Sequence, residues 1–169
     1  GITGCSRGIG FSILETFSKN GANILACIRE YNEDFKNKVD QISKNYGNEI
    51  NIVSFNLESE QEIERGFLEI KKIKNNIDIL VNNAGINQMS LFQMISLKNF
   101  RSVFEINFFS IVSFTQKILK LMNKNNFSKI INISSNASFL SDAGRSAYAP
   151  SKAALESLTK VLSKEMSNY

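Results

Sequence analysis

The stretch that decides the fold reads Thr3-Gly4-Cys5-Ser6-Arg7-Gly8-Ile9-Gly10, close to the start of the chain. It lies between Ile2, the remnant of an apolar strand, and a helical pattern from Phe11 to Asn20. Glycines at such a junction allow a tight turn, close approach of the backbone to a pyrophosphate, and packing of the helix on the sheet. The helix N-terminus adds free N–H groups and a positive dipole. The loop therefore predicts a dinucleotide site.

Strand-like and helix-like runs alternate after this loop. We expect strands at Asn23–Ile28, Ile50–Phe55, Ile77–Val81 and Lys129–Ile133, and helices at Asn32–Tyr46, from Ser59 onward, at Leu97–Met122 and at Pro150–Ser167. The helix from Ser59 has a capping box with Glu62, and its buried stripe is Ile63, Phe67, Ile70 and Ile73. This alternation is typical of an α/β fold with a parallel sheet covered on both faces.

Length and composition fit one domain. The chain has 169 residues, of which 43% are hydrophobic and 21% charged, so we expect a single dinucleotide-binding domain over residues 1–169. No apolar run approaches the roughly 18–20 residues of a membrane span, and the first residues do not resemble a signal peptide. We expect a cytoplasmic protein without a membrane partner, and a sequence that is incomplete at both ends.

Charge and residue types narrow the chemistry. The net charge of +4 is spread over helical segments without a basic block, which argues against nucleic-acid binding. Cys5 and Cys27 match no metal-binding spacing, and we expect no metal. Because the chain has no histidine, acid–base chemistry must use tyrosine, lysine, cysteine or carboxylates.

A tyrosine and a lysine four residues apart supply such chemistry in Tyr148-Ala149-Pro150-Ser151-Lys152. Pro150 suits the first turn of a helix, and residues i and i+4 share one helix face. Free tyrosine has a pKa of about 10, and a nearby ammonium favours its ionised form. Tyr148 could then give a proton to a carbonyl or take one from an alcohol.

Taken together, these motifs resemble the short-chain dehydrogenases/reductases. The family signature Thr-Gly-x-x-x-Gly-x-Gly begins at Thr3, and its Asn-Asn-Ala-Gly motif is Asn82-Asn83-Ala84-Gly85. Ser135 lies thirteen residues before Tyr148, as the substrate-orienting serine of the family does, and Asn107 resembles the fourth catalytic member. The resemblance implies a Rossmann-type doubly wound parallel sheet with strand order 3-2-1-4-5, whose final strands are missing here.

The resemblance also implies roles for the four catalytic candidates. Ser135 would bind the substrate oxygen, and Tyr148 would act as general acid in reduction and general base in oxidation. Lys152 would tune Tyr148 and bind the nicotinamide ribose. Asn107 would distort its helix and hold a water in a proton relay. Ser134 and Ser138 compete with Ser135; alternation along the strand is expected to place Ser134 on the opposite face.

The cofactor is expected to be NADP(H) rather than NAD(H). The second strand ends at Ile28-Arg29, where a carboxylate would repel a 2′-phosphate and an arginine suits one. Arg7 is a second cation, whereas Glu30 could weaken the preference. Family members with basic residues at the positions of Arg7 and Arg29 generally look NADP-specific. The cofactor-binding set is then Gly4, Cys5, Ser6, Arg7, Gly8, Ile9, Gly10, Arg29, Asn56, Leu57, Asn82, Ala84, Gly85, Tyr148 and Lys152.

The resemblance is strongest to the 3-oxoacyl-carrier-protein reductases of fatty acid synthesis. It implies a small-molecule or carrier-bound carbonyl substrate and, for the full-length chain, a homodimer or homotetramer. Phe104, Phe108, Phe109 and Phe114 are candidates for that interface or for the core. Two alternatives stay open: an enzyme for a sugar, steroid or other small alcohol, and a non-catalytic NADP-binding sensor.

Overall fold

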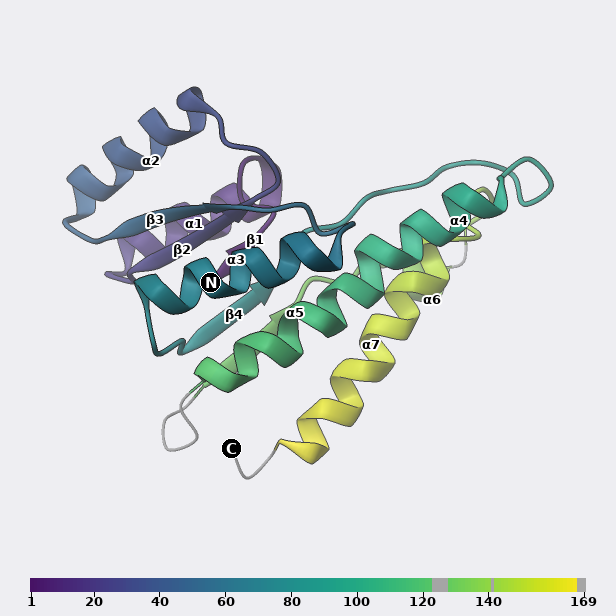
Figure 1. The fold of residues 1–169 in the computed structure, drawn as a ribbon. Helices are drawn as coiled ribbons and strands as arrows, with labels where there is room; N and C mark the ends of the chain where they lie inside the picture. The colour runs from purple at the N-terminus through teal and green to yellow at the C-terminus, as the bar shows by residue number, and fades with distance from the viewer. Residues whose placement is uncertain (123–127, 141, 167–169) are drawn as a thin grey trace.

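The computed structural model describes residues 1–122, 128–140 and 142–166. Its centre is a parallel sheet of five strands in the order β3-β2-β1-β4-β5 (Figure 1). The strands are β1 (Ile2–Thr3), β2 (Ile24–Ile28), β3 (Ile50–Ser54), β4 (Ile79–Asn82) and β5 (Lys129–Asn132). The predicted α/β fold and strand order 3-2-1-4-5 are confirmed.

Helices cover both faces of this sheet (Figure 1). They are α1 (Gly8–Lys19), α2 (Glu33–Tyr46), α3 (Glu60–Ile73), α4 (Leu97–Phe104), α5 (Ser110–Ile118), the short α6 (Ala137–Leu140) and α7 (Tyr148–Glu165). Residues of β2 alternate between the two layers. Ile24, Ala26 and Ile28 pack with α1 and α2, while Leu25 and Cys27 pack with α3 and α5. This alternation follows from the period of two along a strand.

Two helix starts lie earlier in the chain than the sequence pattern predicts. Helix α1 begins at Gly8 rather than Phe11, so the last glycines of the loop belong to its first turn. Helix α7 begins at Tyr148 rather than Pro150, which puts Tyr148 inside the helix. Its predicted end at Ser167 lies outside the described residues. In α3, Ser59 Oγ accepts from the Glu62 N–H (3.3 Å), which is one half of the predicted capping box; the Ser59 N–H donates to the Asn56 carbonyl (3.3 Å) rather than to Glu62.

The helical stretch predicted from Leu97 to Met122 is not one regular helix. A π-helical turn, Glu105–Phe109, separates α4 from α5, and the last turn, Leu119–Leu121, is 3-10 helix. The Ser110 hydroxyl donates to the Ile106 carbonyl (2.7 Å), a bond that competes with the regular helix ladder. Phe114 belongs to the core, and Phe109 is 53% exposed. Among the described residues, no helix is long and apolar enough to cross a membrane.

Candidate active site

A cleft of about 740 Å³ opens at the carboxyl ends of β1 to β4. In open α/β sheets this is where ligands bind. Nine of the predicted cofactor residues line it: Gly4, Ser6, Arg7, Ile9, Arg29, Asn56, Leu57, Ala84 and Gly85. Thr3, Tyr31, Lys38, Asn83 and Ile86 also line it and were not in the predicted set. Of these, Thr3 and Asn83 could have been predicted, because they belong to the glycine-rich and Asn-Asn-Ala-Gly motifs.

The glycine-rich loop has the shape of a phosphate cradle. Gly4 (φ 65°) and Gly8 (φ 56°) adopt the left-handed region, and a Cβ on Gly4 would lie 2.8 Å from the Ala84 Cα. A Cβ built on Gly8 would meet no atom within 4 Å apart from its chain neighbours and the backbone of its own helix. Arg7, the N-cap of α1, makes no side-chain capping bond, so the first N–H groups of α1 stay available to an anion. These features fit a nucleotide pyrophosphate.

Thr3 joins this loop to the segment after β4. Its Oγ1 accepts from the N–H groups of Asn83 and Ala84, both at 3.1 Å. The Asn83 Nδ2 in turn donates to the carbonyls of Thr3 (3.1 Å) and Gly4 (3.0 Å). Asn82 points into the fold, where its Nδ2 binds Thr115 (3.0 Å) and Asn132 (2.8 Å) and braces the sheet. The two walls of the cleft are therefore held together by side chains.

Charged side chains of both signs, among them Arg29, Glu30 and Asp34, line the cleft at the end of β2, where the dinucleotide's adenosine ribose would lie. Arg29 is exposed there, and its Nε lies 3.7 Å from Glu30 Oε1 in an exposed pair. Such surface pairs contribute only about 0–1 kcal/mol, so Glu30 leaves the guanidinium available. Lys38 lines the same part of the cleft from α2. This end can bind a phosphate group.

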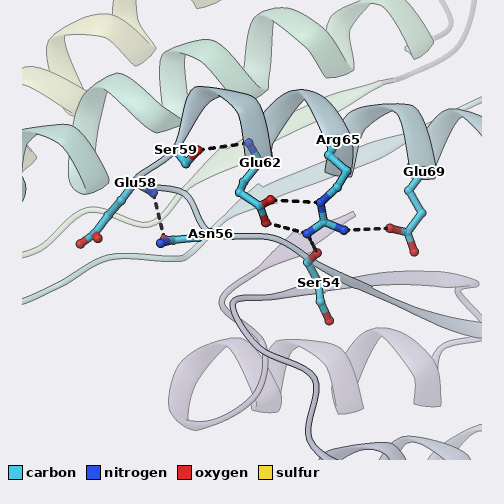
Figure 2. A network of polar contacts seen from close by, with 7 residues as sticks. All are labelled: Ser54, Asn56, Glu58, Ser59, Glu62, Arg65 and Glu69. Atoms are coloured by element: carbon cyan, nitrogen blue, oxygen red, sulfur yellow. Dashed lines mark hydrogen bonds and ion pairs between the residues drawn. The ribbon is translucent and has the colours of Figure 1, made fainter.

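The turn after β3 carries Asn56 and Leu57 and is fixed by a polar network (Figure 2). Arg65 on α3 donates to the Ser54 carbonyl (2.8 Å) and pairs with Glu62 (2.6 Å). The arginine lowers the pKa of the Glu62 carboxyl. The Asn56 Oδ1 accepts from the Glu58 N–H (3.0 Å), so this oxygen already has one donor.

Tyr148 and Lys152 share one face of α7, as predicted. Lys152 is buried, and its Nζ donates to the Ile133 carbonyl at 2.8 Å. Burial lowers the pKa of this ammonium group. Tyr148 is partly buried, and the Arg145 guanidinium lies 5.8 Å from the centre of its ring. The helix thus carries a phenol and a desolvated amine one turn apart.

Asn107 lies buried in the π-helical turn and bonds three groups. Its Oδ1 accepts from the Ile86 N–H (2.8 Å), while its Nδ2 donates to the Ile86 carbonyl (2.9 Å) and to Ser151 Oγ (3.2 Å). The distortion expected at this residue is present. Ser151, which was not predicted, connects Asn107 to α7. Its position between Tyr148 and Lys152 in the sequence could have marked it as a site residue.

Ser135 follows β5 in the segment that leads to α6. The expectation that strand alternation separates it from Ser134 is wrong, because β5 ends at Asn132. The two serines differ instead in their bonds. Ser134 Oγ donates to Glu156 (2.6 Å), whereas Ser135 Oγ accepts from the Ala137 N–H (3.2 Å). Ser138 also donates to Glu156 (2.6 Å).

The remaining predicted residues lie behind or beyond the cleft. Within the part of the chain that the structure describes, its lining does not include Cys5, Gly8, Gly10, Asn82, Asn107, Ser135, Tyr148 or Lys152. Cys5 is buried, and its thiol faces the Cys27 carbonyl (3.7 Å). A Cβ on Gly10 would collide with the Gly4 carbonyl oxygen, so Gly10 allows α1 to pack against the loop. The roles of these residues stay predictions.

Known proteins match this sequence over nearly its whole length. A family profile described as short chain dehydrogenase matches residues 1–169. A 3-oxoacyl-(acyl-carrier-protein) reductase of Aquifex aeolicus is 36% identical over 98% of this chain and 66% of its own length. An NADPH-dependent 3-dehydrocapnine reductase of Ornithobacterium rhinotracheale is 30% identical over 99% of this chain and 60% of its own. The chain thus spans about 66% of the Aquifex relative.

Solved structures share the fold. The RhlG/NADP active-site complex of Pseudomonas aeruginosa superposes with a TM-score of 0.88 at 31% identity, covering 98% of this chain and 65% of that one. A 3-oxoacyl-(acyl-carrier-protein) reductase of Brucella melitensis gives 0.88 at 26% identity, covering 98% and 68%.

Proposed function

This chain belongs to the short-chain dehydrogenase family, and from that premise we propose that the full-length protein is a cytoplasmic, NADPH-dependent oxidoreductase that reduces a carbonyl to an alcohol. The preferred substrate is a 3-oxoacyl thioester on a carrier protein, as in fatty acid synthesis. The names of the 3-oxoacyl-(acyl-carrier-protein) reductase relatives support this substrate class.

One observation carries the proposal: Gly85 separates the nucleotide cleft from the candidate catalytic groups. Gly85 lines the cleft. A Cβ built on it would lie 3.1 Å from Asn107 Oδ1 and 3.4 Å from Lys152 Nζ. A nicotinamide ribose that reached this end of the cleft would therefore meet the lysine of α7.

Four side chains would then share the chemistry. The bound nicotinamide would supply the hydride. Ser135 would donate a hydrogen bond to the substrate oxygen as negative charge develops there. Tyr148 would give that oxygen a proton, and the Lys152 ammonium would stabilise the phenolate left behind. Asn107 would hold the Ile86 backbone beside this site and support a water relay to Lys152.

Arg7, Arg29 and Lys38 support NADPH over NADH. All three line the cleft together with Glu30, Asp34 and Glu58, but no carboxylate follows Ile28 directly. An arginine can bind a phosphate through two parallel N–H donors. The RhlG/NADP complex, a structural relative at 31% identity, supports the same choice.

Exposed apolar side chains in the segment after β4 favour a substrate with an apolar chain. The segment after β4 pairs with the segment before α7, through Ser90 N to the Gly144 carbonyl (2.8 Å). This segment carries Met89 and Phe92, which are 77% and 74% exposed. Apolar side chains grouped on a surface commonly mark a ligand or partner site.

The test follows NADPH absorbance with the purified full-length protein. Acetoacetyl thioesters and a panel of sugar, steroid and small ketones serve as substrates. We expect the thioester to be reduced with a higher kcat/KM than any ketone of the panel. Tight NADPH binding with no turnover of any carbonyl would favour a sensor and contradict the proposal.

A further inference from the structure

We propose that Glu156 is a positioning residue whose carboxylate clamps the segment carrying Ser135 against the helix carrying Tyr148. This inference rests on the proposed function, because the role of Ser135 belongs to it. The carboxylate is the acceptor for two hydroxyls that flank Ser135: Ser134 Oγ and Ser138 Oγ both donate to Glu156 Oε1 at 2.6 Å.

Glu156 continues the functional face of α7. Tyr148, Lys152 and Glu156 follow one another at intervals of four residues, so they lie along one side of the helix. Lys152 and Glu156 each bind the chain just beyond β5. Lys152 Nζ donates to the Ile133 carbonyl (2.8 Å), and Glu156 accepts from Ser134 Oγ. One turn of helix thus bonds two consecutive residues after the strand.

A third bond extends this contact along α7. The Asn132 Nδ2, at the end of β5, donates to Thr159 Oγ1 at 2.8 Å. Residues 132, 133 and 134 are therefore each bound by a side chain of α7. Glu156 is the member of this series that also reaches forward, past Ser135, to Ser138.

Ser138 closes the loop around Ser135. Its Oγ donates to Glu156 and also lies 2.7 Å from the Ser135 carbonyl. With Ser134 and Ser138 both held by one carboxylate, the backbone on each side of Ser135 is tied to α7. The separation of the Ser135 and Tyr148 hydroxyls, which would bind one substrate oxygen together, then depends on Glu156.

A carboxylate suits this task better than a neutral side chain. An ionised carboxylate only accepts, so both serine hydroxyls must donate to it. Charge-assisted bonds are roughly twice as strong as neutral ones. The serine bonds lower the pKa of the Glu156 carboxyl, which keeps it ionised at neutral pH. A small cavity of about 280 Å³ adjoins the carboxylate, lined by Glu156, Ser134 and Lys160 among others.

Two measurements on the full-length protein test the clamp. The first is amide hydrogen exchange, which needs no substrate. In Glu156→Ala, exchange should rise at residues 133–140 and stay unchanged in α1 and β2. Glu165→Ala, a loss of the same charge at the exposed end of α7, is the matched control and should change neither region. Unchanged exchange at 133–140 would overturn the proposal.

The second measurement is kinetic. Glu156→Ala should lower kcat/KM for the carbonyl by roughly 10- to 100-fold, since misplacement by about 1 Å costs about 10²-fold, with the Kd for NADPH unchanged. Glu156→Gln keeps an accepting oxygen and should recover most of the loss. In a Ser135→Ala background, adding Glu156→Ala should lower kcat/KM by a further factor of less than about two, because the effects of coupled residues are not additive.

The outcomes separate the two proposals. Equal losses from Glu156→Ala in both backgrounds, or a parallel loss of NADPH binding, would overturn the role through Ser135. A wild-type protein that binds NADPH but turns over no carbonyl would overturn the proposed function. In that case the exchange at 133–140 alone decides whether Glu156 is a clamp.

Discussion

Asn107 and Ser151 are hydrogen-bonded across the site: Asn107 Nδ2 donates to Ser151 Oγ at 3.2 Å, although the two residues are 44 positions apart. The Ser151 hydroxyl also donates to the Tyr148 carbonyl at 2.7 Å. The π-helical turn is therefore joined, through one serine, to the first turn of α7. Because π-helical turns occur often at functional sites, we attribute the irregularity to this connection.

Replacing Asn107 by alanine should destabilise the fold as well as the site. The change leaves both polar groups of the Ile86 backbone and the Ser151 hydroxyl without this partner. A buried polar group left unsatisfied costs about 1–3 kcal/mol, so we expect a loss of roughly 2–4 kcal/mol in the free energy of unfolding, measured by urea denaturation. Asn107→Asp keeps the acceptor oxygen for the Ile86 N–H but buries a carboxylate against the Ile86 carbonyl, so it should not restore the lost stability. A loss below about 1 kcal/mol in the alanine variant would contradict this account.

Replacing Arg29 by alanine should weaken NADPH binding and spare NADH. A hydrogen bond to a charged group contributes about 1.5–3 kcal/mol, which corresponds to a rise of roughly 10- to 100-fold in the Kd for NADPH. Fluorescence titration of both cofactors measures the change. Arg101→Ala, on the exposed side of α4, serves as the control. An equal rise for NADH would show that Arg29 does not bind the 2′-phosphate.

Gly66 on α3 allows the Phe55 ring to pack. A Cβ there would lie 2.6 Å from the Phe55 Cγ, and Phe55 is buried against Phe114 (5.3 Å between ring centres). Overpacking costs about 1–3 kcal/mol, and alanine recovers about 1 kcal/mol in helix propensity. Gly66→Ala should therefore lower the free energy of unfolding by up to about 2 kcal/mol.

Thermal and urea unfolding measure that change, with Gln61→Ala on the exposed side of α3 as the control. Adding Phe55→Leu to Gly66→Ala should recover part of the lost free energy of unfolding. A Gly66→Ala protein that is more stable than wild type would mean that the Phe55 ring moves aside without cost.

Both cysteines should resist thiol reagents in the folded protein. Burial raises the pKa of Cys27 to about 12 and that of Cys5 well above its usual range. Since the thiolate is the reactive form, a pKa of about 12 leaves a fraction of only about 10⁻⁴ ionised at pH 8. Iodoacetamide labelling followed by peptide mass mapping should find Cys5 and Cys27 unmodified until urea unfolds the chain. Rapid labelling of either residue under native conditions would contradict the buried placement.

Local patterns in the sequence predicted most of the strands and helices and the glycine-rich turn, whereas the strand order was predicted from the family resemblance. The apolar run at Asn23–Ile28, the glycine-rich turn and the cap at Ser59 are each a signal contained within a few neighbouring residues. The cleft follows from them, because parallel strands bring Gly4, Arg29, Asn56 and Gly85 to one edge of the sheet.

Side-chain bonds between distant elements could not be predicted in this way. Glu156 binds Ser134 and Ser138, which lie 22 and 18 positions earlier in the chain. Asn107 binds Ile86, which lies 21 positions earlier. Neither contact leaves a periodic pattern. For the same reason α6 was missed, since its four residues lie in a segment that is bonded to α7 through Ser138 and Glu156.

The central claim is that Tyr148 gives the proton in carbonyl reduction, and Tyr148→Phe in the full-length protein tests it most directly. Removing only the hydroxyl should lower kcat with an acetoacetyl thioester by roughly 10²- to 10⁴-fold, the usual range for general acid–base catalysis. The Kd for NADPH and the unfolding midpoint should stay unchanged. A Tyr148→Phe enzyme that reduces the thioester within about threefold of the wild-type rate would contradict the account.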